Sequence, residues 1–404
     1  MLTVLSVTEA AERVLNSIGT GTGSEIVSMC SAVGRVLSGP LTVPADLPPF
    51  PRSSMDGYAV AARDTYGAAE SFPALLSVAG EVPMGARPPA ALAPGQAMRI
   101  ATGGMLPEGS DAVVMVEHTE TLDAVTVAVG RPVAPGENIV ARGEDLQAGE
   151  TVLPAGHRLR ARDLSVLAAL GYVRVAVTKR PRVAIISTGD ELVPPEQEPA
   201  PGQIRDVNTA LLTALVEQAG GEAVPLGIVP DREEAFFAVL RQTTGCDCVI
   251  LSGGSSAGAR DLTAAVLDRL GRPGVLFHGV SMRPGKPLIF GVADNLPYFG
   301  LSGNPTSALV GFIVLVRPLL WKLSASTEQQ LYFPVRVERS LSSAGGREDY
   351  YRVQVFEQEG ELWARPLPGQ AGLLSTMLHG NALLRLPQNC EGVEAGEKAT
   401  VLLL

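Results

Sequence analysis

Three turns whose residues could bind an anion lie between positions 246 and 307 of the chain. The first, Ser252-Gly253-Gly254-Ser255, follows the short apolar run at residues 248–251. Glycine lets backbone N–H groups face an anion without a Cβ atom in the way, and the serine hydroxyls add donors. A helical pattern opens at Asp261, so the turn also faces a helix N-terminus, where anions bind favourably. The Gly-Lys-Ser/Thr ending of a P-loop is absent, which argues against nucleotide hydrolysis of that type.

The other two turns offer cations and a second helix start. Arg283 and Lys286 lie in a proline-stiffened turn, where arginine can bind an oxyanion through two nitrogens and lysine supplies a mobile point charge. Alone, this turn would be interpreted as a solvated hairpin. The third turn, Ser302-Gly303-Asn304-Pro305, precedes a long apolar stretch, and its residue types suit a helix cap and a first helical position. Three such turns in one segment predict a ligand that carries phosphate.

Carboxylates follow the predicted strands of the same region. Asp190 and Glu191 come after the apolar run at residues 183–187, and Asp231 comes after a second run. Ligands of open α/β sheets bind beyond the carboxyl ends of the strands, so these acids and the glycine turns should share one rim. Hard carboxylate oxygens are the ligands that Mg²⁺ prefers, so these three residues form a candidate metal set. The simpler interpretation, that one or two of them only cap helices or turns, stays open.

Strand and helix patterns alternate from residue 182 onward, which predicts a mostly parallel, doubly wound sheet. At the N-terminus, Ser6-x-x-Glu9 is a capping box that predicts a helix start. Short β-rich runs at residues 72–140 predict a small β domain or barrel, and a further β-rich region begins near residue 328. In the sheet, strands are expected at residues 183–187, 224–229, 249–251 and 287–291, with helices near 208–219, 233–241, 261–270 and 306–320.

The composition describes a globular protein with several domains, because 404 residues exceed one ordinary core. The net charge of −10 argues against nucleic-acid binding, which requires a basic face, so an anionic substrate must be attracted by a local patch. No secretory signal is visible, and the longest apolar run, residues 308–316, is too short to span a bilayer. We therefore expect a soluble, cytoplasmic protein that binds neither nucleic acid nor membrane.

Cysteine and histidine give little support for a transition-metal site. The four cysteines lack the spacing of a metal knuckle and are expected to be reduced thiols. The four histidines are dispersed along the chain, which argues against a zinc site or an acid–base dyad.

The chain resembles the molybdopterin molybdenumtransferase family (MoeA and the gephyrin E domain) through motifs that follow the expected order over nearly its whole length. Each motif alone is unspecific, since Asp56-Gly57, for example, normally forms a turn. The matching runs are Met55-Asp56-Gly57-Tyr58-Ala59, Thr102-Gly103, residues 107–114, Gly143-Glu144-Asp145, residues 187–192, Gly202-Gln203-Ile204, Ser252-Gly253-Gly254, Pro284-Gly285-Lys286-Pro287 and Ser302-Gly303-Asn304-Pro305.

The resemblance implies an elongated homodimer of α/β plus β fold, with four domains per subunit. An inserted β domain, residues 45–140, would interrupt a connecting domain made of residues 1–44 and 141–178, whose N-terminal helix could pack on the α/β domain. A doubly wound molybdopterin-binding α/β domain, residues 179–326, and a C-terminal β-barrel domain, residues 327–404, would follow. The active cleft would be shared between subunits, and a transient contact with the molybdopterin adenylyltransferase is implied.

The implied activity is insertion of molybdenum from molybdate into adenylylated molybdopterin, with Mg²⁺, releasing AMP and molybdenum cofactor. Carried over by motif position, the catalytic residues are Asp56, Thr102, Asp145, Glu191, Asp231, Asp261 and Lys286. The substrate-binding residues are Ser252, Gly253, Gly254, Ser255, Arg283, Ser302, Gly303, Asn304, Pro305 and Arg352, and the metal-binding residues are Asp190, Glu191, Asp231 and Asp261.

The chain departs from the family pattern at three places. Ser255-Ser256-Ala257 replaces a commoner Val-Ser-hydrophobic run, and Arg283 stands where lysine is frequent. Gln370-Ala371-Gly372 stands where many members have Gln-Gly-Ser. The serine hydroxyl of the family is therefore missing, and Ser375 or Thr376 would have to replace it.

Other function classes stay open. A scaffold, like the related receptor-clustering E domain, would not need the retained carboxylates Asp190, Glu191, Asp231 and Asp261. An adenylyltransferase acting on molybdopterin shares the α/β domain, but the two additional β-rich regions argue against it. A tungsten-inserting variant has no distinguishing sequence feature, because tungstate and molybdate differ little in size or charge.

Overall fold

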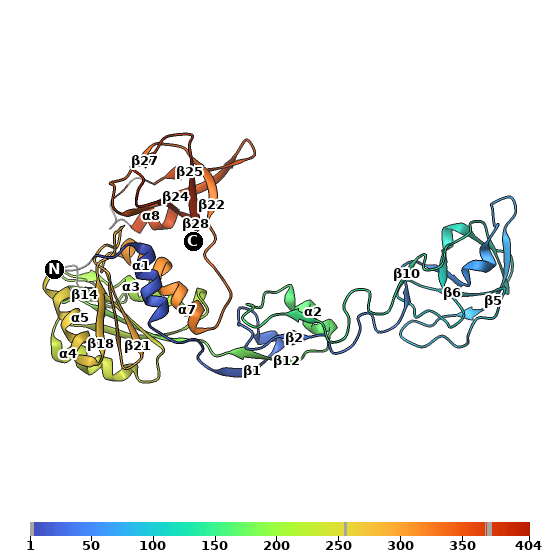
Figure 1. Cartoon of the computed structure of the whole chain (residues 1–404), viewed down its shortest axis with the longest axis horizontal. Coiled ribbons are helices and arrows are strands. Elements are labelled where there is room, and N and C mark those ends of the chain that lie inside the picture. The colour runs from blue at the N-terminus through green and yellow to red at the C-terminus, as the bar shows by residue number, and fades with distance from the viewer. Residues whose placement is uncertain (1–3, 254–256, 368, 370–373) are drawn as a thin grey trace. The chain divides into compact units, whose positions relative to one another are not determined.

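The computed structural model describes residues 4–253, 257–367, 369 and 374–404, and the side chains of residues 254–262 lie outside this description. The chain forms two compact units (Figure 1). The first comprises Met1–Gly39, Gly156–Arg160 and Arg174–Leu404, and the second comprises Pro40–Ala155 and Ala161–Val173. Each unit has hydrophobic clusters of its own. The finer division into four domains stays a prediction.

The first unit is built around a six-stranded sheet. In spatial order its strands are β16 (Glu222–Val229), β13 (Arg182–Thr188), β17 (Cys248–Gly253), β21 (Leu296–Leu301), β20 (Ile289–Ala293) and β18 (Pro273–His278). The first four are parallel, while β20 and β18 run antiparallel to their neighbours. The strand expected at residues 287–291 is therefore the antiparallel β20, and the sequence analysis missed β18 and β21.

A tight hairpin explains the reversal between β20 and β21. Its two connecting residues, Asp294 and Asn295, both have positive φ, at 50° and 66°. This is the backbone of a type I′ turn, in which Asn and Asp are favoured beside glycine. The Asp-Asn pair between two apolar runs was therefore a usable hairpin signal in the sequence.

Helices cover both faces of this sheet. They are α1 (Val7–Asn16), α3 (Asn208–Gln218), α4 (Glu233–Leu240), α5 (Ala257–Leu270), α6 (Pro305–Gly311) and α7 (Arg317–Leu323). Val183 and Ile185 of β13 enter one core with α1, α3, α6 and α7. Ala184 and Ile186 enter a second core with α4 and α5. A strand buried on both faces must be apolar throughout, and the doubly wound sheet predicted from the continuous apolar runs is confirmed.

The N-terminal helix begins where the sequence predicts. Glu9 N–H donates to Ser6 Oγ at 3.2 Å, and Ser6 N–H donates to Glu9 Oε2 at 2.9 Å, so both halves of the capping box are present. Val7, Ala10 and Val14 are the buried residues of this helix. Because they share a core with the sheet strands, α1 packs on the α/β part of the unit.

A continuous helical stretch, Pro305–Leu323, passes through the same core. It joins α6 to α7 through the π-helical segment η5 (Phe312–Val316) and exceeds the helix predicted at residues 306–320. Among the described residues it is the one helix long and apolar enough to cross a membrane by length and composition. However, 78% of its apolar window is buried inside the protein, as in a core helix.

The C-terminal part of the first unit is a closed β-barrel. Its strands, all within the β-rich region predicted from about residue 328, are β22 (Phe333–Val337), β24 (Glu348–Gln358), β25 (Glu361–Pro366), β26 (Ala382–Leu386) and β28 (Lys398–Leu403). Since β24 pairs with both β25 and β26, the sheet has no free edge there. The short strand β19 (Met282–Arg283) adds to β24 in parallel and attaches the barrel to the α/β part. Helix α8 (Leu374–His379) was not predicted.

Short antiparallel or parallel ladders complete the first unit. The pairs are β1 (Ser24–Ser28) with β12 (Arg174–Thr178), β14 (Leu192–Val193) with β15 (Ile204–Arg205), and β23 (Leu341–Ser342) with β27 (Gly392–Val393).

The second unit contains an open six-stranded sheet, which confirms the β-rich character predicted for residues 72–140. In spatial order its strands are β7 (Ala112–Met115), β4 (Gly57–Val60), β6 (Gln96–Ile100), β5 (Ala74–Glu81), β9 (Thr126–Val129) and β8 (Thr119–Thr121). The unit also holds β2 (Leu41–Thr42) paired with β11 (Thr151–Leu153), β3 (Arg52–Ser53) paired with β10 (Ile139–Val140), and helix α2 (Asp163–Ala169).

Gly57 opens β4 at a point where no side chain fits. A Cβ atom on Gly57 would lie 1.9 Å from the carbonyl oxygen of Val114 on the neighbouring strand β7. This close approach fixes the residue type directly after Asp56. The backbone that presents the Asp56 carboxylate is therefore held by strand packing.

We expect Gly57→Ala to destabilise the second unit by about 3 kcal/mol, because the added methyl must displace the β7 backbone. Gly130→Ala is the matched control in the same unit, since the nearest atom to its new Cβ would lie 3.7 Å away. Chemical denaturation followed by circular dichroism measures both variants. Equal unfolding midpoints would show that the close approach is wrong.

Candidate functional site

A cavity of about 630 Å³, here called the rim cavity, opens at the carboxyl ends of the parallel strands. Thr188 and Glu191 enter it after β13, and Ser252 and Gly253 enter it at the end of β17. The turn that follows β21 contributes Gly303, Asn304 and Pro305. The predicted convergence of the glycine turns on one rim is thus present in the structure.

Asn208, at the start of α3, holds the two turns together. Its Nδ2 donates to Ser252 Oγ at 2.8 Å and to Gly303 O at 2.9 Å. The residue is buried, and among the described residues its Oδ1 has no hydrogen-bond partner. An unpaired buried amide oxygen is costly, so it is available to accept a hydrogen bond from a ligand.

Asp206 fixes the position of Asn208. Its Oδ1 accepts from Asn208 N–H at 2.9 Å and from Thr209 N–H at 3.2 Å, while its Oδ2 accepts from Thr209 Oγ1 at 2.6 Å. These bonds satisfy backbone donors in the first turn of α3. The sequence analysis missed Asp206 and Asn208, although an Asp-x-Asn-Thr run before an apolar helical pattern is a helix-start signal.

The first glycine turn leaves space for a ligand because Gly253 cannot carry a side chain there. Gly253 has φ of +148°, and a Cβ atom on it would lie 2.1 Å from Thr188 O. A Cβ atom on Gly303 would lie 3.4 Å from Gly253 Cα, an ordinary van der Waals distance, so the second turn lies close to the first but does not exclude a side chain. Gly254, Ser255 and the side chain of Asp261 lie outside the described residues.

The third turn is a helix N-terminus, as predicted. Asn304 caps α6 by accepting from Thr306 N–H at 3.2 Å, and Pro305 occupies the first helical position. Ser302 Oγ accepts from Asn304 N–H at 3.3 Å and so fixes the cap residue. The aligned peptide dipoles of the following helix favour negative charge beside this turn.

Three of the predicted metal ligands are close neighbours at the ends of β13 and β16. Asp231 N–H donates to Asp190 Oδ1 at 3.3 Å. Burial, followed by the charges of Asp190 and Glu191, raises the pKa of the Asp231 carboxyl. Its Oδ1 is buried and has no partner among the described residues. No group of three His, Cys, Asp or Glu side chains in the described part of the chain is already arranged around a single metal position.

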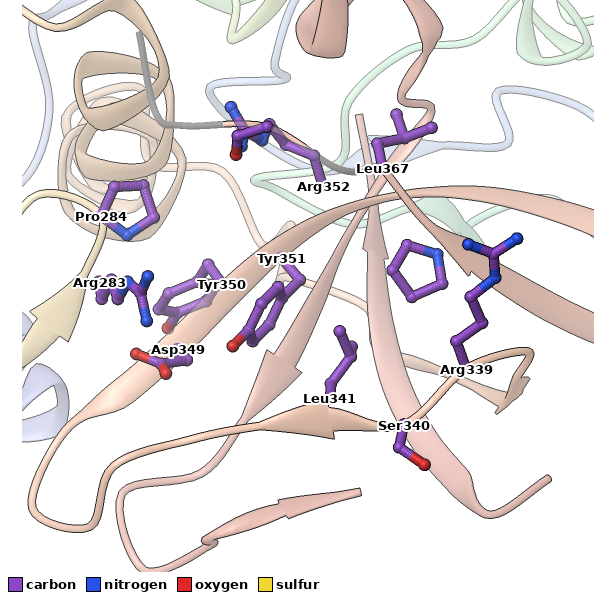
Figure 2. Close-up of a pocket in the computed structure, with 12 residues that line it drawn as sticks. Arg283, Pro284, Arg339, Ser340, Leu341, Asp349, Tyr350, Tyr351, Arg352 and Leu367 are labelled. Atoms are coloured by element: carbon purple, nitrogen blue, oxygen red, sulfur yellow. The ribbon is translucent and has the colours of Figure 1, made fainter. Parts of the chain in front are cut away.

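Cations line two further cavities of the first unit. A cavity of about 380 Å³, here called the arginine cavity, is lined by Arg283, Arg339 and Arg352 (Figure 2). A cavity of about 650 Å³, here called the lysine cavity, is lined by Arg283, Lys286 and Arg347. Since Arg283 lines both, the structure brings together the three cations that the sequence analysis selected.

Arg352 connects the arginine cavity to the third turn. Its Nη1 donates to Thr306 Oγ1 at 3.0 Å, and its Nη2 donates to Gly369 O at 3.0 Å. Thr306 lies in the first turn of α6, next to Asn304 and Pro305 of the rim cavity. Partial burial lowers the pKa of the Arg352 guanidinium, and the group remains a cation at neutral pH.

Figure 2 shows further polar groups that the sequence analysis did not select. Arg339 lies across the arginine cavity from Arg283, with Tyr350 and Tyr351 between them. Among the described lining residues, Asp349 is the acidic one. Its side chain is buried, at 1% exposure, and accepts a hydrogen bond from Arg347 Nε at 2.8 Å. Its charge is therefore compensated, and the cavity stays positive.

In the second unit, the structure joins two of the three predicted residues. Thr102 donates to Asp56 Oδ1 through its N–H at 2.7 Å and through its Oγ1 at 2.9 Å. These two bonds lower the pKa of Asp56 and keep it ionised. Asp145 is exposed, and its N–H donates to Leu47 O at 3.1 Å. No described contact joins Asp145 to Asp56 or Thr102.

Comparison with known proteins covers the whole chain. Residues 5–171 match the MoeA N-terminal region (domain I and II), residues 184–322 a probable molybdopterin binding domain, and residues 334–404 the MoeA C-terminal region (domain IV). The chain is 38% identical to a molybdopterin molybdenumtransferase of Nostoc sp., over 94% of this chain and 89% of the relative. It is 34% identical to the Bacillus subtilis protein of that name, over 100% of this chain and 94% of the relative.

The fold agrees with a solved relative. The structure of the molybdopterin biosynthesis moeA protein from Pyrococcus horikoshii OT3 superposes with a TM-score of 0.86 at 33% identity, covering 100% of both chains. The resemblance that the motifs indicated is confirmed over the whole length. This chain belongs to the MoeA family of molybdopterin molybdenumtransferases.

Proposed function

We propose that this protein inserts molybdenum from molybdate into adenylylated molybdopterin and releases AMP, as a step of molybdenum cofactor biosynthesis. The observation that carries the proposal is the rim cavity, in which Asn208 joins two glycine turns beside the carboxylate of Glu191. The neighbouring arginine and lysine cavities add the cations that an oxyanion requires. Curated relatives of this chain carry the name molybdopterin molybdenumtransferase.

Different residues of the rim cavity would bind different parts of the substrate. Backbone N–H groups near Ser252 and Gly253 and the capped N-terminus of α6 would bind the phosphate oxygens of the substrate. Asn208 Oδ1, which has no partner among the described residues, would accept a hydrogen bond from a donor group of the substrate. The substrate would thereby be held at two points, which orients it for transfer.

The carboxylates at the rim fit a Mg²⁺ ion in their chemistry. Mg²⁺ takes hard oxygen ligands and usually one or two carboxylates beside substrate phosphates, and Asp231 Oδ1 is a buried oxygen without a partner in the described part of the chain. Asp190, Glu191, Asp231 and Asp261 are the residues that would hold it. When bound, Mg²⁺ would neutralise phosphate charge next to the transferring group.

The cations would bind molybdate. Arg283 and Arg352 offer planar guanidinium groups to a tetrahedral dianion, and Lys286 offers a mobile ammonium group beside them. Because the whole chain carries a net charge of −10, this local positive patch would attract an anion that the rest of the surface repels.

We further propose a cytoplasmic homodimer with active clefts shared between subunits. Each cleft would take Asp56, Thr102 and Asp145 from one subunit and the residues of the rim, arginine and lysine cavities from the other. A transient contact with the molybdopterin adenylyltransferase would deliver the adenylylated substrate. This arrangement rests on the family resemblance and on the separation of these residues into two compact units of the chain.

Release of AMP from purified protein, adenylylated molybdopterin, Mg²⁺ and molybdate tests the function directly. We expect release that requires both molybdate and Mg²⁺, and tungstate in place of molybdate tests the alternative metal. Tight binding of the adenylylated pterin without release would contradict the transferase and indicate a binding or scaffolding protein that has lost turnover. Release that is the same without molybdate would contradict metal insertion.

Asp231→Asn should reduce AMP release without reducing the stability of the fold. The raised pKa means that ionised Asp231 destabilises the metal-free fold above that pKa, and that this penalty disappears as the pH falls below it. At pH 7 the variant should therefore melt at the same or a slightly higher temperature. The gain in the free energy of unfolding should not exceed about 1 kcal/mol, because Asp231 is partly solvated. AMP release should fall by about 100-fold or more, since an amide is a poorer Mg²⁺ ligand.

Glu198→Gln provides the matched control, because Glu198 is an exposed acid of the same region outside the lining of the rim cavity. It should retain both melting temperature and activity. A parallel loss of melting temperature and AMP release in Asp231→Asn, measured by calorimetry and the release assay, would make Asp231 a structural residue.

Mixing two inactive variants tests the shared cleft. If Asp56 and Lys286 of one cleft come from different subunits, Asp56→Ala and Lys286→Ala proteins that are mixed and allowed to exchange subunits should regain about a quarter of the wild-type activity. Half of the dimers would be mixed, and each mixed dimer would hold one intact cleft. No recovery despite exchange, with mixed dimers confirmed by native mass spectrometry, would place both residues in a cleft of one subunit.

A further inference from the structure

A fourth cavity, of about 350 Å³, lies in the first unit and is here called the helix cavity. Its walls come from the C-terminal part of α3, from the stretch α6 to α7, and from Arg158 and Glu328. It shares none of its described lining residues with the rim, arginine or lysine cavity. Much of its wall is apolar, and the apolar lining residues include Leu215, Leu309, Phe312 and Ile313.

One charged side chain in this wall has an N–H group without a hydrogen-bond acceptor. Arg317 Nε is buried and has no hydrogen-bond partner among the described residues, and the guanidinium lies 5.1 Å from the ring centroid of Trp321. Burial lowers the pKa of this guanidinium, because few polar atoms replace its hydration. A buried N–H without an acceptor is costly, so an anionic group in the cavity would be stabilised.

The neighbouring polar groups are already paired with one another. Arg158 donates through Nε to Glu328 Oε2 at 2.5 Å, and through its two Nη atoms to the carbonyl oxygens of Gly34 at 2.8 Å and Ala219 at 2.9 Å. The hydroxyl of the nearby Tyr332 donates to Gln330 Oε1 at 3.1 Å. In the described part of the wall, Arg317 Nε is therefore the charged-group donor without an acceptor, since the nearby acid Glu328 is already bound by Arg158.

We propose that the helix cavity binds a small monocarboxylate with an apolar body. The carboxylate would accept from Arg317, and the hydrocarbon part would lie against Leu309, Phe312 and Trp321. The volume falls within the range of small-molecule sites, about 300–1,000 Å³. A carboxylate suits the site better than a phosphate, because one guanidinium with an unpaired N–H, surrounded by apolar side chains, cannot satisfy several phosphate oxygens.

The helix cavity is remote from the candidate site along the same helices. The helical stretch that starts at Pro305, in the rim cavity, reaches Arg317 twelve residues later, a rise of about 18 Å at about 1.5 Å per residue. The inference therefore concerns a second ligand and does not depend on the proposed transferase activity.

Tryptophan fluorescence provides the test, because the chain has two tryptophans and Trp321 lines the cavity. In a Trp363→Phe background, titration with hexanoate should give a saturable change of Trp321 emission. Hexan-1-ol, which has the same apolar body and no charge, should give none in the same concentration range. Equal responses to both compounds, or no saturable response to hexanoate, would overturn the proposal.

Two variants assign the effect to Arg317. Arg317→Met should weaken hexanoate binding by about tenfold or more, because it removes the charge and keeps an apolar stem. Arg269→Met is the matched control, since the Arg269 guanidinium also lies 5.1 Å from an aromatic ring, that of Phe237, but is paired with Glu233. Equal hexanoate affinity in the Arg317 variant and the control would overturn the proposal.

A second variant keeps the test valid if Arg317→Met does not fold. Gln218 is exposed at the edge of the cavity, and Gln218→Glu should place a negative charge there without disturbing the core. It should weaken hexanoate binding and leave hexan-1-ol unaffected. The competing explanation is that this surface contacts another copy of the chain. Light scattering on the same samples tests it. If Arg317→Met changes the molecular mass and the unsubstituted protein does not bind hexanoate, the proposal is wrong.

Discussion

The amide of Asn208 is the constraint on which the candidate site depends. An asparagine side chain has two N–H donors and one acceptor oxygen, and both donor bonds go to turns that follow neighbouring strands. Ser252 and Gly303 are thereby held at one distance from each other, next to Gly253, where a Cβ atom would lie 2.1 Å from Thr188 O. An aspartate could not replace Asn208, because it has no donor for Gly303 O at neutral pH. The remaining acceptor, Oδ1, is buried and has no partner among the described residues.

Charge is separated within this rim. The acids follow β13 and β16, whereas the cations come from β19, from the turn after it and from β24. Burial, followed by the charges of Asp190 and Glu191, raises the pKa of Asp231, and three guanidinium groups line the arginine cavity. Neither group is at its most stable without a counter-charge. A substrate that brings both a metal-bound phosphate and an oxyanion would satisfy both groups, which is why one compact unit can hold two like-charged clusters.

The sequence predicted the elements whose signals are local. The capping box of α1, the continuous apolar runs of β13 and β17, and the Asn-Pro start of α6 each depend on neighbouring residues, and the structure confirms them. The direction of β20 and the presence of β18 were not predicted, because an apolar run gives burial but not orientation. The helix α8 follows residues outside the described part of the chain and has six residues, too few for a periodic signal.

Site residues divide in the same way. The glycine turns and the carboxylates were predicted from position alone, since the carboxyl ends of parallel strands must meet. Asn208 was missed because a single asparagine at a helix start has many possible roles. Arg352 and the Asp56–Thr102 pair were selected only through the family resemblance, because no local pattern reveals that Arg352 reaches Thr306 or that residues 46 positions apart form two hydrogen bonds.

The barrel contributes to the site mainly through strand register. β19 pairs with β24 so that Arg283 lies opposite Asp349, three residues before Arg352 on the same strand. Glu348, the preceding residue, is buried and bound by both Arg385 Nε and Nη2 of β26 at 2.8 Å, and it also accepts from the Tyr350 hydroxyl at 2.8 Å. Removing one partner of such a buried ion pair typically costs about 3–5 kcal/mol, so β24 cannot slide against β26. The distance between Arg283 and Arg352 is therefore set by barrel closure, and the barrel is part of the anion site although it supplies few of its side chains.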